Sequence, residues 1–185
     1  MIRPTPIDEM INLDKDRYFI SSTDTKGIIT SANPYFKGIS GYSAEELLGQ
    51  PHSIIRHPDM PRVIFKIMWE RIQAGENMAA VVKNLAKDGR YYWVVTDFDI
   101  LRDDKGDIKG YVAYRKAAPH DTIQAVIPIY KKLLEVEATG GMEASQIELT
   151  NILKSMKMRY TDFIEGEIKR SGFLRSVARK LFGKW

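Results

Sequence analysis

The sequence has no cysteine among its 185 residues, which excludes a disulfide-stabilised fold and a metal site built on thiolates. It also lacks any run of about 18 apolar residues, the length that a membrane-spanning helix needs. The segment Met1–Pro6 has no signal-peptide core, so we expect a cytoplasmic protein. Walker, Rossmann, G-x-S-x-G and H-E-x-x-H motifs are missing too, and we expect no enzymatic activity.

No sign of charge dominates the chain, since 28 Lys and Arg stand against 24 Asp and Glu. Residues 1–118 carry 17 basic and 16 acidic side chains, residues 119–168 carry 5 and 8, and residues 169–185 carry 6 and none. Nucleic-acid-binding domains spread Lys and Arg over one surface, so the near-neutral first part argues against a nucleic-acid partner. The basic end favours an acidic partner, a membrane surface or simple solvation.

What the chain does contain is 44% hydrophobic and 10% aromatic residues, enough to form a sizeable core. Its length suits one domain of about 100–150 residues with an appendage. We divide it into an N-terminal cap segment (1–17), a main domain (18–118), a connecting helix (119–141) and a C-terminal helical output region with a basic end (142–185).

Local signals predict the order of elements in the domain. Two β-prone runs surround a turn closed by Gly27, Asn33 and Pro34 begin a short helix, and Ser43 to Glu46 form a capping box. Apolar residues recur at helical spacing from Pro61 to Gly75. Strand-like runs at 78–85, 91–101 and 108–115 are joined by Asp-Gly and Lys-Gly turns. We therefore predict an α+β domain, a five-stranded antiparallel sheet with helices on one face, followed by C-terminal α-helices.

Helical patterns dominate after Pro119. Residues 121–138 should be helical, with Pro128 starting or kinking the helix and Gly140-Gly141 ending it. A second long helix should run from about Glu143 through Ile164. Residues 169–185 predict a basic amphipathic helix, which either packs on the protein or a partner or makes peripheral contact with a membrane.

The order of elements, together with Asp24–Gly27, Asn33 and Ser40–Gly49, resembles a PAS domain. The next block is more specific: Gln50–Pro61, followed by Phe65, Trp69, Gly75, Val82–Asn84, Asp88-Gly89 and Tyr92–Val94. Over residues 17–134 it is similar to the PAS domain of bacterial aerotaxis (energy-taxis) receptors. One departure is Met78-Ala79-Ala80, where members commonly carry Trp-Ser or Trp-Thr plus Gly.

This resemblance implies a PAS fold that binds FAD as a redox sensor and reports to the chemotaxis machinery. The transmembrane, HAMP and kinase-control segments of a full receptor are missing from this sequence. The resemblance therefore implies a soluble stand-alone form, a homodimer, that signals in trans to a membrane-bound chemotaxis transducer.

Three residues in the proline-rich block are candidates for holding the diphosphate of FAD. Arg56 offers a forked, permanently charged donor, His57 one further bond, and Asp59 a carboxylate that could hold either or accept from ribose hydroxyls. The spacing alone favours a structural Arg–Asp pair, whereas the resemblance favours the cofactor role. His52, His57 and Asp59 make only a weak metal pattern.

Two amides and several rings are candidates for the flavin ring. Asn33 competes with its own role as a helix cap. Asn84 shares a strand face with Val82, where an unpaired amide costs about 1–3 kcal/mol, so we favour a ring-edge contact over an outward-facing side chain. Phe65, Trp69 and Tyr92 could line the slot. Tyr92 and Trp93 must point to opposite sides of their strand.

Two alternatives stay open at this stage: a haem gas sensor with His52 or His57 as axial ligand, and a cofactor-free PAS interaction module. For the flavin reading, we hypothesise that reduction changes a hydrogen bond to an amide such as Asn84. The sheet would relay that change to the helices after Pro119.

Overall fold

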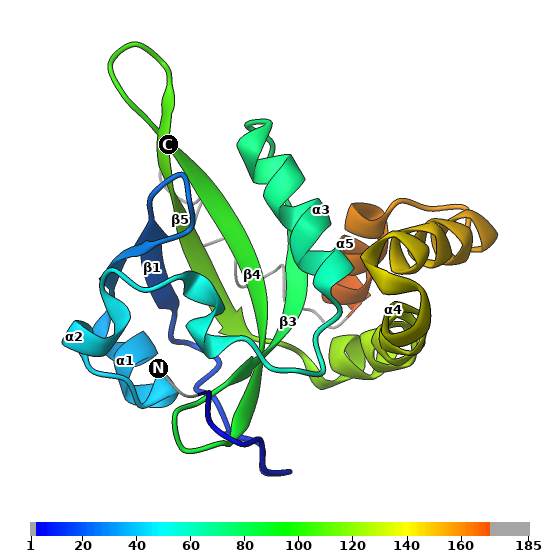
Figure 1. The fold of residues 1–185 in the computed structure, drawn as a ribbon, viewed down its shortest axis with the longest axis horizontal. Coiled ribbons are helices and arrows are strands. Elements are labelled where there is room, and N and C mark those ends of the chain that lie inside the picture. The colour runs from blue at the N-terminus through cyan, green and yellow to red at the C-terminus, as the bar shows by residue number, and fades with distance from the viewer. Residues whose placement is uncertain (1–2, 171–185) are drawn as a thin grey trace. The chain divides into compact units, whose positions relative to one another are not determined.

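The computed structural model describes residues 3–170, which divide into two units at Ala117/Ala118. Five strands of the first unit form one antiparallel sheet in the order β2-β1-β5-β4-β3 (Figure 1). The strands are β1 (Phe19–Thr23), β2 (Ile29–Ala32), β3 (Ala80–Leu85), β4 (Tyr91–Arg102) and β5 (Ile108–Ala117). The predicted α+β class, five strands and antiparallel pairing are confirmed.

The segment between β2 and β3 is helical, and its caps are those predicted. Helix α1 (Pro34–Ser40) begins at Asn33, whose side chain accepts a hydrogen bond from the Phe36 N–H, and ends at a left-handed Gly41. Helix α2 (Ala44–Leu47) has the full capping box. A 3-10 turn, η1 (His52–Ile55), and helix α3 (Arg62–Gln73) follow. These helices carry the large apolar side chains that fill the core, among them Phe36, Leu47, Ile55 and Ile64.

The register of the strands determines which side chains point from the sheet into this core. Arg115 of β5 lies opposite Thr96 of β4 on one side and Phe19 of β1 on the other. Asn84 of β3 lies opposite Tyr92. Directly opposed residues in an antiparallel pair point to the same face. Tyr92 stacks on Phe19 at a ring distance of 5.6 Å, so these residues form one inner face.

The N-terminal segment follows the start of β4. The Ile7 N–H donates to the Gly89 carbonyl at 2.9 Å, and the Ile11 N–H donates to the Tyr91 carbonyl at 2.8 Å. A Cβ at Gly89 would lie 2.4 Å from the Thr5 carbonyl oxygen, and the φ of Gly89 is +92°. Glycine is thus required at this turn both by the backbone angle and by the close approach of the N-terminal segment.

The second unit consists of α4 (His120–Ser155) and α5 (Tyr160–Arg170). The break at Gly141 is confirmed by its φ of 74° and ψ of −175°. Of the two roles predicted for Pro128, that of starting a helix is wrong, because α4 runs through this residue. Pro128 and Gln124, whose carbonyl loses its helical partner, are both exposed, so water can satisfy that carbonyl.

The prediction of one long helix from Glu143 to Ile164 was also wrong. The helix ends at Ser155 and α5 begins at Tyr160, while Ile147 of the expected apolar stripe is 59% exposed. The predicted basic helix of residues 169–185 lies outside the described residues beyond Arg170. Within residues 3–170, no helix combines the length and the apolarity that a membrane crossing requires.

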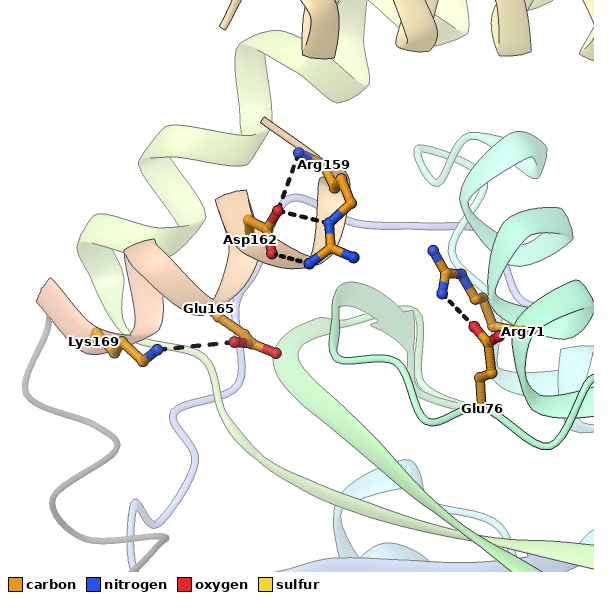
Figure 2. Close-up of polar contacts among 6 residues, drawn as sticks. All are labelled: Arg71, Glu76, Arg159, Asp162, Glu165 and Lys169. Atoms are coloured by element: carbon orange, nitrogen blue, oxygen red, sulfur yellow. Dashed lines mark hydrogen bonds and ion pairs between the residues drawn. The ribbon is translucent and has the colours of Figure 1, made fainter. Parts of the chain in front are cut away.

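Helix α5 has a buried and a charged side. Its buried residues are Tyr160, Phe163, Ile164 and Ile168. The charged side carries a two-pronged Arg159–Asp162 pair, at 2.8 and 2.9 Å, and a Glu165–Lys169 pair (Figure 2). The Tyr130 and Tyr160 hydroxyls, 2.7 Å apart, connect α4 to α5. Exposed ion pairs of this kind add little stability, so the buried side of α5 holds it in place.

Candidate functional site

The inner face of the sheet holds a buried guanidinium. Arg115 is 5% exposed and donates to Ser21 Oγ at 3.0 Å and to His52 Nε2 at 2.8 Å. Burial lowers the pKa of Arg115 to about 10, which leaves it charged at neutral pH. Among the described residues no carboxylate pairs with it. A buried charge without a counter-charge is unfavourable unless something else compensates it.

The partners of Arg115 fix the state of His52. Because a guanidinium only donates, His52 Nε2 must be the acceptor, and the ring is neutral. Burial, followed by repulsion from Arg115, holds the pKa of His52 well below its usual value. Ser21 Oγ also lies 3.1 Å from the same His52 nitrogen. The His52 ring stacks on Phe36 of α1, so this triad joins β1, β5, η1 and α1.

Two buried hydroxyls on this face lack partners. Tyr92 Oη and Thr96 Oγ1 are both buried without a hydrogen-bond partner in the structure. Tyr92 faces Asn84, which is 4% exposed, although no hydrogen bond of ordinary geometry joins them. Burial raises the pKa of Tyr92, and Arg115 is close enough to oppose that shift. Unpaired buried hydroxyls are rare, so their clustering beside Arg115 calls for a ligand or a functional reason.

The chain from Arg56 to Met60 runs along the edge of the sheet. Arg56 forms an isolated bridge with Asn84, which brings the two residues together. The Arg56 guanidinium lies 4.2 Å from the centre of the Phe65 ring and donates to the Met60 carbonyl at 3.2 Å. The structure thus places Arg56, Phe65, Asn84 and Tyr92 in one neighbourhood.

His57 and Asp59 belong to a second polar group centred on Lys83. Lys83 Nζ lies 2.6 Å from Asp59 Oδ2 and 4.2 Å from the centre of the Tyr91 ring. His57 Nδ1 accepts the Asp59 N–H at 3.0 Å, and His57 is 3% exposed. Burial and, next, repulsion from Lys83 lower the pKa of His57 to about 4, with Asp59 opposing them. Lys83 was not among the predicted residues.

We expect this neutral His57 to make stability depend on pH. Its pKa is about 4 in the fold against about 6.5 in an unfolded chain, so the unfolded chain binds more protons between these values. The free energy of unfolding should therefore fall as the pH drops from 6.5 towards 4, by up to about 1.4 kcal/mol per pH unit from this group. Urea unfolding of His57→Asn should show a correspondingly flatter profile. Equal slopes in the two proteins would contradict this.

The two remaining predicted residues lie elsewhere. Both ends of the Asn33 amide are in use, because its oxygen accepts the Phe36 N–H at 2.9 Å and its nitrogen donates to the Tyr18 carbonyl at 2.8 Å. The predicted helix cap is confirmed. Trp69 meets Tyr111 edge-on at 5.6 Å, at the Gly27 end of the sheet.

Sequence reasoning missed Arg115, Ser21 and Thr96 as parts of the site, and considered His52 only as a metal or haem ligand. One signal was available for Arg115. It alternates with Tyr111 and Ala113 on β5, so a charge falls on the apolar side of a strand, the same argument that pointed to Asn84.

Comparisons with known proteins agree with this architecture. Residues 29–115 match the family described as "PAS fold". The aerotaxis receptor of Escherichia coli (strain K12) is 43% identical over 122 residues, which are 65% of this chain and 24% of the receptor. The biofilm dispersion protein BdlA of Pseudomonas aeruginosa is 30% identical over 92 residues, 49% of this chain and 22% of that protein. The chain thus spans about a quarter or less of these relatives.

Solved structures support the same fold. The dark structure of the blue-light photoreceptor Aureochrome1 LOV matches with a TM-score of 0.53 and 26% identity, over 63% of this chain and 86% of that one. The PAS domain of a protein from Colwellia psychrerythraea matches with a TM-score of 0.51 and 21% identity, over 55% and 86%. The predicted PAS architecture is confirmed.

Proposed function

Because residues 29–115 form a PAS domain of the aerotaxis receptor family, we propose that this chain binds FAD and signals its redox state to a chemotaxis transducer. The relatives that support this reading are a receptor named for aerotaxis and a biofilm dispersion protein. In this proposal the transducer is a separate polypeptide.

The observation that carries the proposal is the unsatisfied polar chemistry of the inner face. Arg115 is buried without a carboxylate, and the Tyr92 and Thr96 hydroxyls are buried without partners. Each unpaired hydroxyl costs about 1–3 kcal/mol in a dry interior. A flavin ring has apolar faces and an edge rich in oxygen and nitrogen acceptors, so it suits a site of aromatic walls and a few donors. The residues present therefore fit this cofactor.

Each predicted residue then has an assigned role. Asn84, Tyr92, Thr96 and Arg115 would hold the polar edge of the ring, and Phe65, Trp69 and Tyr92 would supply apolar walls. Arg56 would bind the diphosphate, with His57, Asp59 and Lys83 forming a second polar group beside it. Asn33 would contribute only by giving up one of its two hydrogen bonds, to Phe36 or to Tyr18.

When bound, FAD supplies reversible uptake of one or two electrons. The permanent charge of Arg115 would stabilise the negative charge that this uptake adds, at the expense of its bonds to Ser21 and His52. His52 would then be free to reorient against Phe36, which carries the change into η1 and α1. A rearrangement of hydrogen bonds is in this way converted into a movement of helices.

The absorbance spectrum of the purified full-length chain tests the proposal directly. We expect flavin bands near about 375 and 450 nm that bleach on reduction with dithionite. Haem would instead give one intense band at about 400–430 nm, and a cofactor-free module neither. Either of those two spectra, in protein reconstituted with FAD, would overturn the proposal. His52 Nε2 and His57 Nδ1 already hold hydrogen bonds, which disfavours them as haem ligands.

A further inference from the structure

Methionine is the only sulfur-containing residue type here, since the sequence has eight Met and no Cys. Three methionines, Met60, Met68 and Met78, are buried in the first unit. Met156 and Met158 are instead 37% and 38% exposed, on either side of Lys157 in the turn between α4 and α5. More than a third of the surface of each residue is thus exposed to an oxidant in solution.

The backbone of this turn has a defined geometry. The Lys157 N–H donates to the Lys154 carbonyl at 3.0 Å, and the Met158 N–H donates to the Leu153 carbonyl at 3.1 Å. This pair of bonds is the Schellman motif that ends many helices. The left-handed position usually holds glycine, but here Lys157 occupies it with a φ of 54°, the one positive φ of a non-glycine residue in the described chain.

A strained turn of this kind depends on other interactions. The residue at the position of Met158 commonly packs its apolar side chain on the last turn of the helix. More than half of the Met158 surface is covered, in keeping with such packing. Oxidation to the sulfoxide makes this side chain polar and weakens its apolar contacts. The turn would lose a contribution that offsets the strain at Lys157.

We propose that Met156 and Met158 form a reversible oxidation site, at which a peroxide converts the thioethers to sulfoxides and loosens the turn between α4 and α5. The sulfur attacks one peroxide oxygen, the O–O bond breaks and an S–O bond forms. Sulfur loses two electrons, and with hydrogen peroxide the departing hydroxide takes the proton from the oxygen now bound to sulfur, which gives the sulfoxide and water. Methionine sulfoxide reductases reverse the change. The site needs no flavin and is thus a second, independent redox input.

The test uses full-length protein, hydrogen peroxide and trypsin, because Lys157 and Arg159 place cleavage sites within the turn. Mass spectrometry should find sulfoxide at Met156 and Met158 forming about tenfold or more faster than at Met60, Met68 and Met78, whose exposure needs larger opening of the fold. Tryptic cleavage of the native turn should rise about three- to tenfold after oxidation. Treatment with the reductases should restore the original rate.

Matched variants separate this proposal from general oxidative damage. Met158→Leu keeps the apolar side chain but cannot be oxidised at this position, so cleavage should respond to peroxide much less than in the wild type, through Met156 alone. Met142→Leu removes an exposed methionine outside the turn and should leave the response intact. Met158→Gln should raise cleavage without any oxidant. An equal peroxide response in the wild type and Met158→Leu, or equal oxidation of buried and exposed methionines, would overturn the proposal.

Discussion

Arg115→Met should weaken FAD binding by about 10- to 100-fold, the effect of removing one hydrogen bond to a charged group. The apoprotein should keep its free energy of unfolding to within about 1 kcal/mol. The two hydrogen-bond partners that Arg115 leaves behind can pair with each other, because Ser21 Oγ lies 3.1 Å from His52 Nε2 and can donate to it. The variant also removes a buried charge that has no carboxylate partner. If Arg115 were important only for the structure, Arg115→Met would instead destabilise the apoprotein and leave FAD affinity unchanged.

Titration of apoprotein with FAD and thermal unfolding of the same samples measure both effects. Arg115→Lys retains the charge but not the forked donor, so its FAD affinity should lie between those of the wild type and Arg115→Met. The exposed Arg102 at the end of β4 provides a control, since Arg102→Met should bind FAD as the wild type does. Unchanged affinity in Arg115→Met, or an apoprotein that no longer folds, would contradict the assignment.

The same variant should shift the redox equilibrium of the bound cofactor. A lost stabilisation of about 1.4 kcal/mol corresponds to about 60 mV for a one-electron step, so the midpoint potential should become more negative by tens of millivolts. A midpoint potential equal to that of the wild type would mean that Arg115 does not stabilise the negative charge of the added electron.

The parts of the fold that the sequence predicted are those set by short-range chemistry. Asn33, Pro34 and Gly41 define α1 within nine residues, and the glycine turns define the hairpins. The break at Gly141 is equally local. Whether Pro128 starts a helix or lies within one was left open, because the cost of proline in a helix depends on whether water can reach the freed carbonyl, and exposure is a property of the folded unit.

In the candidate site, too, the residues found from the sequence are those that a local pattern marks, and the residues missed are those that only the fold brings together. Asn84 was found because alternation along one strand places it among apolar neighbours. The triad of Arg115, Ser21 and His52 was not found. Ser21 and His52 are 94 and 63 positions from Arg115, and the three residues meet only when η1 folds over the sheet. His57 and Asp59 were expected beside Arg56, whereas the structure pairs Asp59 with Lys83, 24 positions away. Pairings over such distances follow from register and packing.

The polar groups of the inner face therefore have opposite effects in the two states of the protein. Without a ligand the unpaired Tyr92 and Thr96 hydroxyls are costs, because a buried donor that lacks a partner has lost its hydrogen bonds to water without replacing them. With a complementary ligand the same groups become its binding contacts. A substitution that removes one of them should therefore stabilise the apoprotein and weaken the complex, and Tyr92 allows the sharpest test of this.

Tyr92→Phe should raise the free energy of unfolding of the apoprotein by about 1 kcal/mol, because it removes a buried hydroxyl without a partner and keeps the ring that stacks on Phe19. FAD affinity should fall about five- to tenfold, the value of one neutral hydrogen bond. Tyr92→Ala, by contrast, should cost about 3–5 kcal/mol through the cavity it leaves. Urea unfolding with and without FAD measures all of these changes.

The control is the same substitution at a tyrosine whose hydroxyl is paired. Tyr130→Phe breaks the 2.7 Å bond to Tyr160 and should lower the free energy of unfolding by about 1 kcal/mol, with no effect on FAD affinity. The two Tyr→Phe variants should thus shift apoprotein stability in opposite directions. If Tyr92→Phe destabilises the apoprotein as Tyr130→Phe does, the Tyr92 hydroxyl already has a partner in the fold, and its assignment to the flavin edge fails.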